Sequence, residues 1–277
     1  MSSNPWNNRR PSSRPPRATP SPAVAGEQAP VARGDNELRL YGVNAVLGMF
    51  ARRPQDLRKL YLLEAQIPRL QPLLKWCVAN RMGYRVVGEG DLNKLAATTH
   101  HEGVVADVVR HEPAALATWL SAQSSGPALA LWLDGVGNPH NLGAILRSAA
   151  HFGVSAILLP AHSKLALSGA AARVAEGGAE AVPLVRLPST PQALAQLRDA
   201  GFHLAATLVS GGDDLFKAEL PQRLVYVMGA EGAGMDRDLA AQCDSRVSIP
   251  GSGAVESLNV ASATAVLLAS WRARQGS

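Results

Sequence analysis

Three stretches, far apart in this chain of 277 residues, combine glycine or proline with one or two polar side chains. They are residues 138–143 leading to Arg147, residues 228–234, and residues 249–251 continuing to 256–260. Each follows an apolar run that is typical of a buried strand. Glycine permits positive φ and lets a ligand approach the backbone without a Cβ in the way, while the few polar groups orient it. The pattern predicts three loops that hold a ligand through the main chain.

The polar side chains of these loops are of types that do chemistry. Asn141 and Arg147 lie six positions apart, so in a helix Arg147 stands about 9 Å further along the axis, under two turns. A guanidinium there can bind a phosphate or carboxylate with two hydrogen bonds, and a surface salt bridge is the alternative. Glu231 is the only acid of the second loop, where a solvated carboxylate is the alternative. Ser257 and Asn259 precede a long apolar helix that either residue can cap.

These loops need a scaffold, and the second half of the chain predicts one. Apolar runs alternate with helical patterns in the way that a mostly parallel α/β sheet requires. Ligands bind such sheets at the loops that follow the carboxyl ends of strands, so we expect the three loops to converge on one pocket. The expected strands are 128–133, 156–159, 181–184, 203–207, 224–228 and 245–249, and the expected helices are 142–152, 169–175, 191–200, 236–242 and 259–274.

A smaller α/β pattern precedes this sheet. Residues 1–36 are rich in Pro, Ser, Arg and Ala, a composition that cannot offset its ordering entropy, and we expect them to be a disordered basic tail. We therefore divide the chain into this tail, a small domain at 37–112, a linker at 113–126 and a large domain at 127–277. In the small domain, helices are expected at 43–52, 68–80 and 91–97, and strands at 57–63, 84–87 and 104–109.

The charge of the chain indicates the kind of partner, and its cysteines indicate the redox compartment. The net charge of +5 and pI near 9.6 favour a polyanion. Residues 36–112 carry eleven basic and eight acidic side chains, whereas residues 113–277 carry eleven basic and twelve acidic ones. We therefore expect the first 112 residues to make much of the contact with a polyanion. Cys77 and Cys243 lack metal-ligand spacing and are expected to be buried thiols in a reduced cytoplasm. No metal site, membrane span or signal peptide is predicted.

The loops also resemble a known family. Residues 133–149, LDGVGNPHNLGAILRSA, resemble the first motif of the SpoU (TrmH-like) branch of the SPOUT RNA methyltransferases. Residues 227–234 are similar to the second motif and residues 249–260 to the third, in the same order. Residues 38–109 resemble the small substrate-binding domain, of L30e-like fold, that precedes the catalytic domain in many members. The resemblance implies an α/β-knot domain with a C-terminal trefoil knot and a homodimer packed through it.

The function that this resemblance implies is methyl transfer from S-adenosylmethionine to a ribose 2′-hydroxyl of rRNA or tRNA. A guanidinium normally stays protonated, with a pKa above about 12, so the proton role of the catalytic arginine is left open. By resemblance, the methyl donor is bound by Gly229, Ile249, Leu258, Gly234 and Pro250, and the catalytic residues are Arg147, Asn141, Glu231, Ser257 and Asn259.

Two other functions are alternatives to this one. A catalytically inactive RNA-binding protein with the same knotted fold is disfavoured because all five polar residues are intact. A dehydrogenase on a doubly wound sheet fails because the glycines run GxxGxG rather than GxGxxG. Asn138 stands where many family members carry Asp, and Glu256 places a carboxylate where it can disfavour phosphate. The sequence does not specify which RNA or which nucleotide is methylated.

Overall fold

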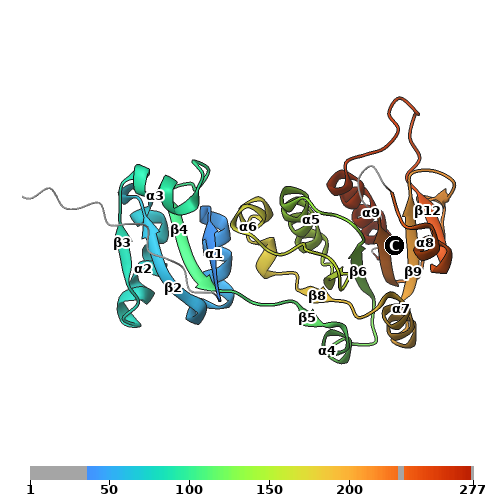
Figure 1. Cartoon of the computed structure of the whole chain (residues 1–277), viewed down its shortest axis with the longest axis horizontal. Helices are drawn as coiled ribbons and strands as arrows, with labels where there is room; N and C mark the ends of the chain where they lie inside the picture. Colours follow the sequence, from blue (N-terminus) through green and yellow to red (C-terminus); the bar gives the residue numbers. More distant parts are fainter. Residues whose placement is uncertain (1–35, 230–233, 276–277) are drawn as a thin grey trace, which may run out of the picture. The chain divides into compact units, whose positions relative to one another are not determined.

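The computed structural model describes residues 36–229 and 234–275, so nearly all of the predicted tail lies outside the described residues. Among the described residues of the large domain, eight strands form one sheet in the order β10-β12-β9-β11-β6-β7-β8-β5, and every pairing is parallel. The predicted parallel α/β sheet is confirmed (Figure 1). The strands are β5 (Ala114–Ala115), β6 (Ala128–Leu133), β7 (Ala156–Leu159), β8 (Leu184–Arg186), β9 (His203–Leu208), β10 (Asp213–Asp214), β11 (Arg223–Met228) and β12 (Ser245–Ser248).

Helices cover both faces of this sheet. In β6, Leu129, Leu131 and Leu133 enter one apolar cluster, and the alternate residues enter a second, which is why its sequence is continuously apolar. The first cluster is completed by α5 (Pro139–Phe152), α6 (Gly169–Ala175) and α9 (Val260–Gln275), and the second by α4 (Leu116–Ser121), α7 (Thr190–Asp199) and α8 (Arg237–Gln242).

Two predicted boundaries of the large domain were wrong. The strand expected at 181–184 begins only at Leu184, because residues 178–180 form a short 3-10 helix, η3 (Gly178–Glu180). The carbonyl of Gly178 accepts from the N–H groups of both Ala181 and Val182, which keeps that stretch out of the sheet. The helix expected from residue 142 begins at Pro139, which stands at the first helical position, and Asn138 Oδ1 caps it by accepting from His140 N at 2.9 Å.

The small domain has a four-stranded sheet in the order β1-β4-β2-β3. Its edge strand β1 pairs antiparallel with β4 and was not predicted. The buried Cys77 belongs to its core, and Cys77 and Cys243 are both buried free thiols, as predicted. The elements are β1 (Glu37–Tyr41), α1 (Val43–Arg52), η1 (Pro54–Asp56), β2 (Leu57–Leu62), η2 (Glu64–Gln66), α2 (Ile67–Ala79), β3 (Tyr84–Val86), α3 (Glu89–Ala96) and β4 (Val104–Val109).

Helix α6 and η3 contact the small domain directly. Ala172 of α6 belongs to the apolar core of the small domain. The Arg53 guanidinium donates two hydrogen bonds of 2.7 Å to the carboxylate of Glu180, and both side chains are about nine-tenths buried. The segment between the domains is also built into the large sheet, because β5 pairs with β8 and α4 buries Trp119.

Candidate active site

The first and second loops follow two neighbouring strands, β6 and β11, at the carboxyl ends of these strands. Met228 at the end of β11 is paired with Leu133 at the end of β6, and Asp134 N donates to Met228 O at 2.8 Å. The third loop leaves β12, which β9 separates from β11. It returns to these strand ends through α9, where Thr264 Oγ1 lies 3.4 Å from Met228 Sδ. Strand pairing thus brings the starts of the first and second loops together, and α9 contacts the end of β11 from the other end of the third loop.

A hydrogen bond joins the first loop to the third. Asn259 Nδ2 donates to Asn141 Oδ1 at 3.2 Å. Asn259 Oδ1 in turn accepts from Ala261 N at 2.9 Å and Ser262 N at 3.4 Å, so Asn259 caps α9 as predicted. One amide thus fixes the start of α9 and holds Asn141, and these two predicted catalytic residues, 118 positions apart, lie together.

Arg147 faces another part of the molecule. It lies about 120° around α5 from Asn141, because six residues turn a helix by about 600°. Its side chain is 64% exposed, and its Nη1 lies 4.0 Å from Glu176 Oε1, just after α6. The structure leaves this guanidinium open to an anionic ligand and directs it toward the segment that contacts the small domain.

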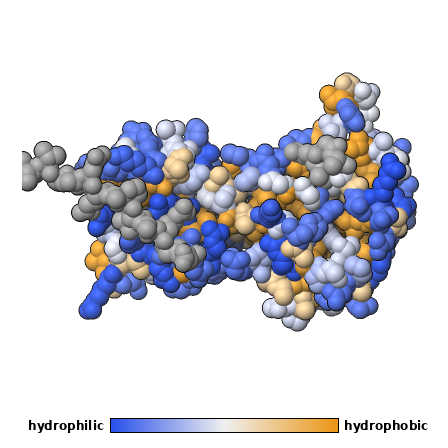
Figure 2. All heavy atoms as spheres, in the orientation of Figure 1, coloured by the Kyte–Doolittle hydropathy of each residue, from blue (hydrophilic) through white to orange (hydrophobic). Residues whose placement is uncertain are grey.

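The predicted methyl-donor residues differ in their exposure to solvent. Gly229 and Ile249 are partly buried, and Gly234, Pro250 and Leu258 are exposed. A Cβ at Gly229 would lie 2.4 Å from the backbone nitrogen of the residue at position 235, so this glycine is required by its own loop. The loop from β12 to α9 projects from the large domain (Figure 1), and its hydrophobic spheres are visible in Figure 2.

The third loop offers exposed apolar side chains and open backbone to a ligand. Leu258 is 47% exposed although it is apolar, and Val255 in the same loop is 70% exposed. A Cβ at Gly251 would meet nothing within 4 Å, so a ligand has room beside that backbone. Such a site can cover a purine with apolar walls and main-chain groups. Ser257 is exposed in this loop, whereas Glu231 lies outside the described residues.

Asp134 and Glu176 are two acidic side chains at this site that the motifs did not single out. Burial raises the pKa of the Asp134 carboxyl; His162 opposes this shift and Asp236 adds to it. Asp134 was visible in the sequence as the only charged residue directly after β6, and Glu176 as the acid before a pair of glycines. Neither pattern states a role without the contacts that the fold provides.

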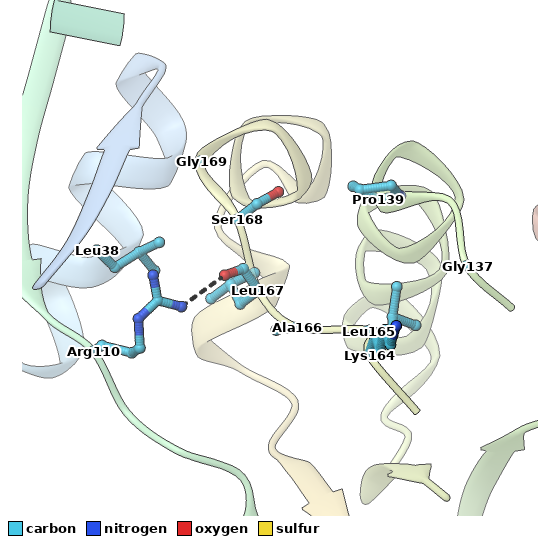
Figure 3. A pocket seen from close by; sticks show the side chains of 10 residues that line it. All are labelled: Leu38, Arg110, Gly137, Pro139, Lys164, Leu165, Ala166, Leu167, Ser168 and Gly169. Atoms are coloured by element: carbon cyan, nitrogen blue, oxygen red, sulfur yellow. Dashed lines mark hydrogen bonds between the residues drawn. The ribbon is translucent and has the colours of Figure 1, made fainter. Parts of the chain in front are cut away.

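A cavity of about 310 Å³ lies beside the first loop and is lined by Gly137, Pro139, Arg110 and Lys164 among others (Figure 3). Arg110 Nη1 donates to Leu167 O at 3.4 Å across it. Two basic side chains on its walls favour an anionic ligand. The described residues contain no group of three or more His, Cys, Asp or Glu side chains that could hold a metal ion. Within that same part of the chain, no helix is long and apolar enough to cross a membrane.

Comparison with known proteins gives matches over both domains. Residues 128–269 match the model of the SpoU rRNA Methylase family, and residues 39–114 match RNA 2'-O ribose methyltransferase substrate binding. An uncharacterized tRNA/rRNA methyltransferase, YfiF of Escherichia coli O157:H7, is 38% identical over 85% of this chain and 68% of its own length. The 23S rRNA (guanosine-2'-O-)-methyltransferase RlmB of Bordetella pertussis is 37% identical over 86% of this chain and 98% of its own.

Among solved structures, the AdoMet-bound rRNA methyltransferase from Sinorhizobium meliloti matches with a TM-score of 0.72. It is 24% identical, and the match covers 86% of this chain and 88% of that chain. At this identity the likeness shows the fold alone, and it covers both domains.

Proposed function

The chain belongs to the SpoU family and is an S-adenosylmethionine-dependent RNA 2′-O-ribose methyltransferase, and from this premise we propose that it methylates ribosomal RNA at a guanosine. The relatives named RlmB support this choice, because they match over nearly their whole length. The structural observation that supports a shared methyl-transfer site is the Asn141–Asn259 hydrogen bond, which joins two motif loops; the choice of a ribosomal guanosine rests on the relatives. Nothing in the comparisons supports the inactive alternative.

We propose that the second and third loops hold the methyl donor. Gly229, Gly234 and Pro250 would offer backbone groups, and Ile249 and Leu258 would cover its purine. S-adenosylmethionine supplies an electrophilic methyl group on a sulfonium, so the protein has to align the donor with the ribose and exclude water. Leu258 supports this assignment, because its exposed apolar surface would be removed from water when the donor binds.

The ribose is assigned to the first loop and its neighbours. Asn141 and Asn259 would orient the ribose, and the resemblance adds Ser257 and Glu231 to the catalytic residues. Arg147, as a protonated guanidinium, would bind the adjacent phosphate and stabilise the developing alkoxide. Its 64% exposure supports this role, since an RNA phosphate can reach it without displacing a buried group.

Residues 37–112 would select the RNA, with residues 113–126 joining them to the catalytic domain at 127–277. The RNA would run beside the first loop. Arg110 and Lys164 support this path, because they put two positive charges on the wall of the cavity next to Pro139. We also propose a reducing, cytoplasmic location, which the two free buried cysteines support.

We propose further that a second copy of the chain covers α9, with the trefoil knot that the resemblance implies at this interface. A groove of about 460 Å³ there is lined by Phe216, Val266, Ala269 and Ala273 among others. Phe216 is 58% exposed, and the outward residues of α9 before Arg272 are small or apolar, so that part of the helix does not favour a solvated face. A monomer by light scattering at micromolar concentration would contradict the dimer.

Mapping ribose methylation in total RNA tests the function. Deletion of the gene should remove methylation at one nucleotide, and the wild-type gene should restore it. Arg147→Ala should fail to restore it, and Arg147→Lys should restore little, because lysine keeps the charge but not the bidentate geometry. Calorimetry with S-adenosylmethionine should show that both variants still bind the donor. Full restoration by Arg147→Ala would refute the role of this residue.

A further inference from the structure

The segment that follows α6 lies against both the small domain and the turn of α5 that carries Arg147. A Cβ at Gly178 would come within 2.8 Å of Leu146 O and 3.1 Å of Arg147 Cα. On the other side, a Cβ at Gly48 of α1 would come within 2.8 Å of Gly177 Cα. The backbone here therefore touches α5 and α1 directly, and it leaves no room for side chains at these glycines.

The carboxylate of Glu176 also contacts both α5 and α1. Its Oε1 lies 4.0 Å from Arg147 Nη1, and its Oε2 accepts a hydrogen bond from Asn44 Nδ2 of α1. Asn44 Oδ1 accepts from Arg69 Nη2 of α2 at 3.0 Å. A continuous line of polar contacts thus runs from an exposed arginine of the small domain to the guanidinium of Arg147.

The backbone of Glu176 is unfavourable for the residue it carries. Its φ is +52°, in the left-handed region that glycine adopts freely and other residues adopt rarely. The ion pair offers little in return, because Arg147 is 64% exposed and exposed pairs contribute little to stability. A positive φ at a non-glycine residue raises the question of what its side chain does, and at position 176 the side chain is the one that contacts Arg147.

We propose that Glu176 is a positioning residue that holds the Arg147 guanidinium for methyl transfer and, through Asn44, couples that position to the small domain. This inference rests on the catalytic role proposed for Arg147. RNA bound near Arg69 would fix Asn44, Asn44 would fix the carboxylate, and the carboxylate would fix the guanidinium. Glu176 itself touches neither the donor nor the ribose in this scheme.

The substitution Glu176→Gly separates this role from a structural one. Glu176→Gly removes the carboxylate and also relieves the positive φ, so its Tm should equal or exceed that of the wild type. With ribosomal RNA from a gene-deletion strain and labelled S-adenosylmethionine, its kcat should fall about tenfold or more, with KM for RNA and donor affinity within about twofold. Asn44→Ala should lower kcat in the same direction, and the double variant should be no worse than Glu176→Gly alone.

Glu102→Gln is the matched control. Glu102 also lies at the domain contact, where its Oε1 pairs with Arg173 Nε at 3.2 Å, but it does not contact Arg147. The kcat of Glu102→Gln should stay at the wild-type value. A loss of kcat equal to that of Glu176→Gly would assign the effect to the domain contact in general. An unchanged kcat in Glu176→Gly, with Arg147→Ala inactive, would overturn this inference alone. Full activity in Arg147→Ala would instead overturn the proposed catalytic role.

Discussion

At the residue scale, Asp134 directly follows β6 with its carboxyl group in a partly buried position, where burial raises its pKa. A raised folded-state pKa means that the native state binds more protons than the unfolded state between the two pKa values. The stability that protonation contributes is therefore fully present below the unfolded pKa, about 3.9, and is lost as pH rises through the folded one. We predict that Asp134→Asn is more stable than the wild type at pH 7 and that this advantage vanishes toward pH 3.

Urea unfolding at several pH values measures this difference. Asp213→Asn, at an exposed carboxylate, is the control for the loss of one surface charge. A variant at position 134 that is less stable than the wild type at neutral pH would show that hydrogen bonds to the ionised carboxylate outweigh its burial.

Residue types predicted part of the site, and packing decided the rest. Ser257 and Asn259 were both possible caps of the last helix, and Asn259 is the residue that caps it; this much is predictable because a cap is a local property of a helix start. The direction of Arg147 could not be predicted in this way, since it depends on how α5 is rotated against α6 and on where Glu176 ends that helix. Local sequence patterns do not encode that rotation.

At the scale of elements, Gly143 shows that a motif glycine can serve helix packing. The sequence suggested a glycine that gives a ligand access to the backbone, but Gly143 is buried within α5 against α6. A Cβ there would lie 2.5 Å from Ala171 O and 2.7 Å from Val174 Cβ. Gly143→Ala should destabilise the protein by about 1–3 kcal/mol, because the helices have to move apart.

Chemical denaturation measures this cost, and Gly90→Ala is the matched control. Gly90 is also helical, in α3, and a Cβ there would meet nothing within 4 Å. That variant should gain up to about 1 kcal/mol from helix propensity. If both alanine variants were stabilised, the close packing of α5 on α6 would be contradicted.

Hydrophobic periodicity located the large-domain strands well because most are apolar on both faces and bounded by polar turns. It missed β1, an edge strand, and the two-residue strands β5 and β10, which are too short to show a period. The start of α5 at Pro139, rather than at residue 142, can be predicted from the sequence, since Asn138 followed by Pro139 is a standard helix-start signal.

At the scale of the whole molecule, composition suggested two domains but could not show that the second contributes to the core of the first. Ala172 belongs to the small-domain core, and a Cβ at Gly169 would lie 2.5 Å from Arg39 O. These contacts join residues more than a hundred positions apart, and no local pattern reports them. The Arg53–Glu180 pair is a buried polar part of the same contact.

This pair should be strongly coupled, because each side chain is 10% exposed and the two hydrogen bonds are parallel. Arg53→Ala should cost about 3–5 kcal/mol, since it leaves the Glu180 carboxylate buried without its partner. Replacing both, with Arg53→Met and Glu180→Leu, should cost much less than the two single changes together. The exposed Arg198–Asp244 pair, at 43% and 28%, is the control and should contribute about 0–1 kcal/mol.

A double-mutant cycle by urea unfolding gives the coupling energy, and limited proteolysis reports where the molecule opens. If the pair holds the domains together, Arg53→Ala should be cleaved faster than the wild type near residues 110–113, before either core unfolds. Additive single changes, with no faster cleavage there, would mean that apolar contacts such as that of Ala172 suffice to hold the small domain in place. The same outcome would weaken the case for polar coupling across this interface at Glu176, because both acids belong to one short segment that contacts α1 and α5.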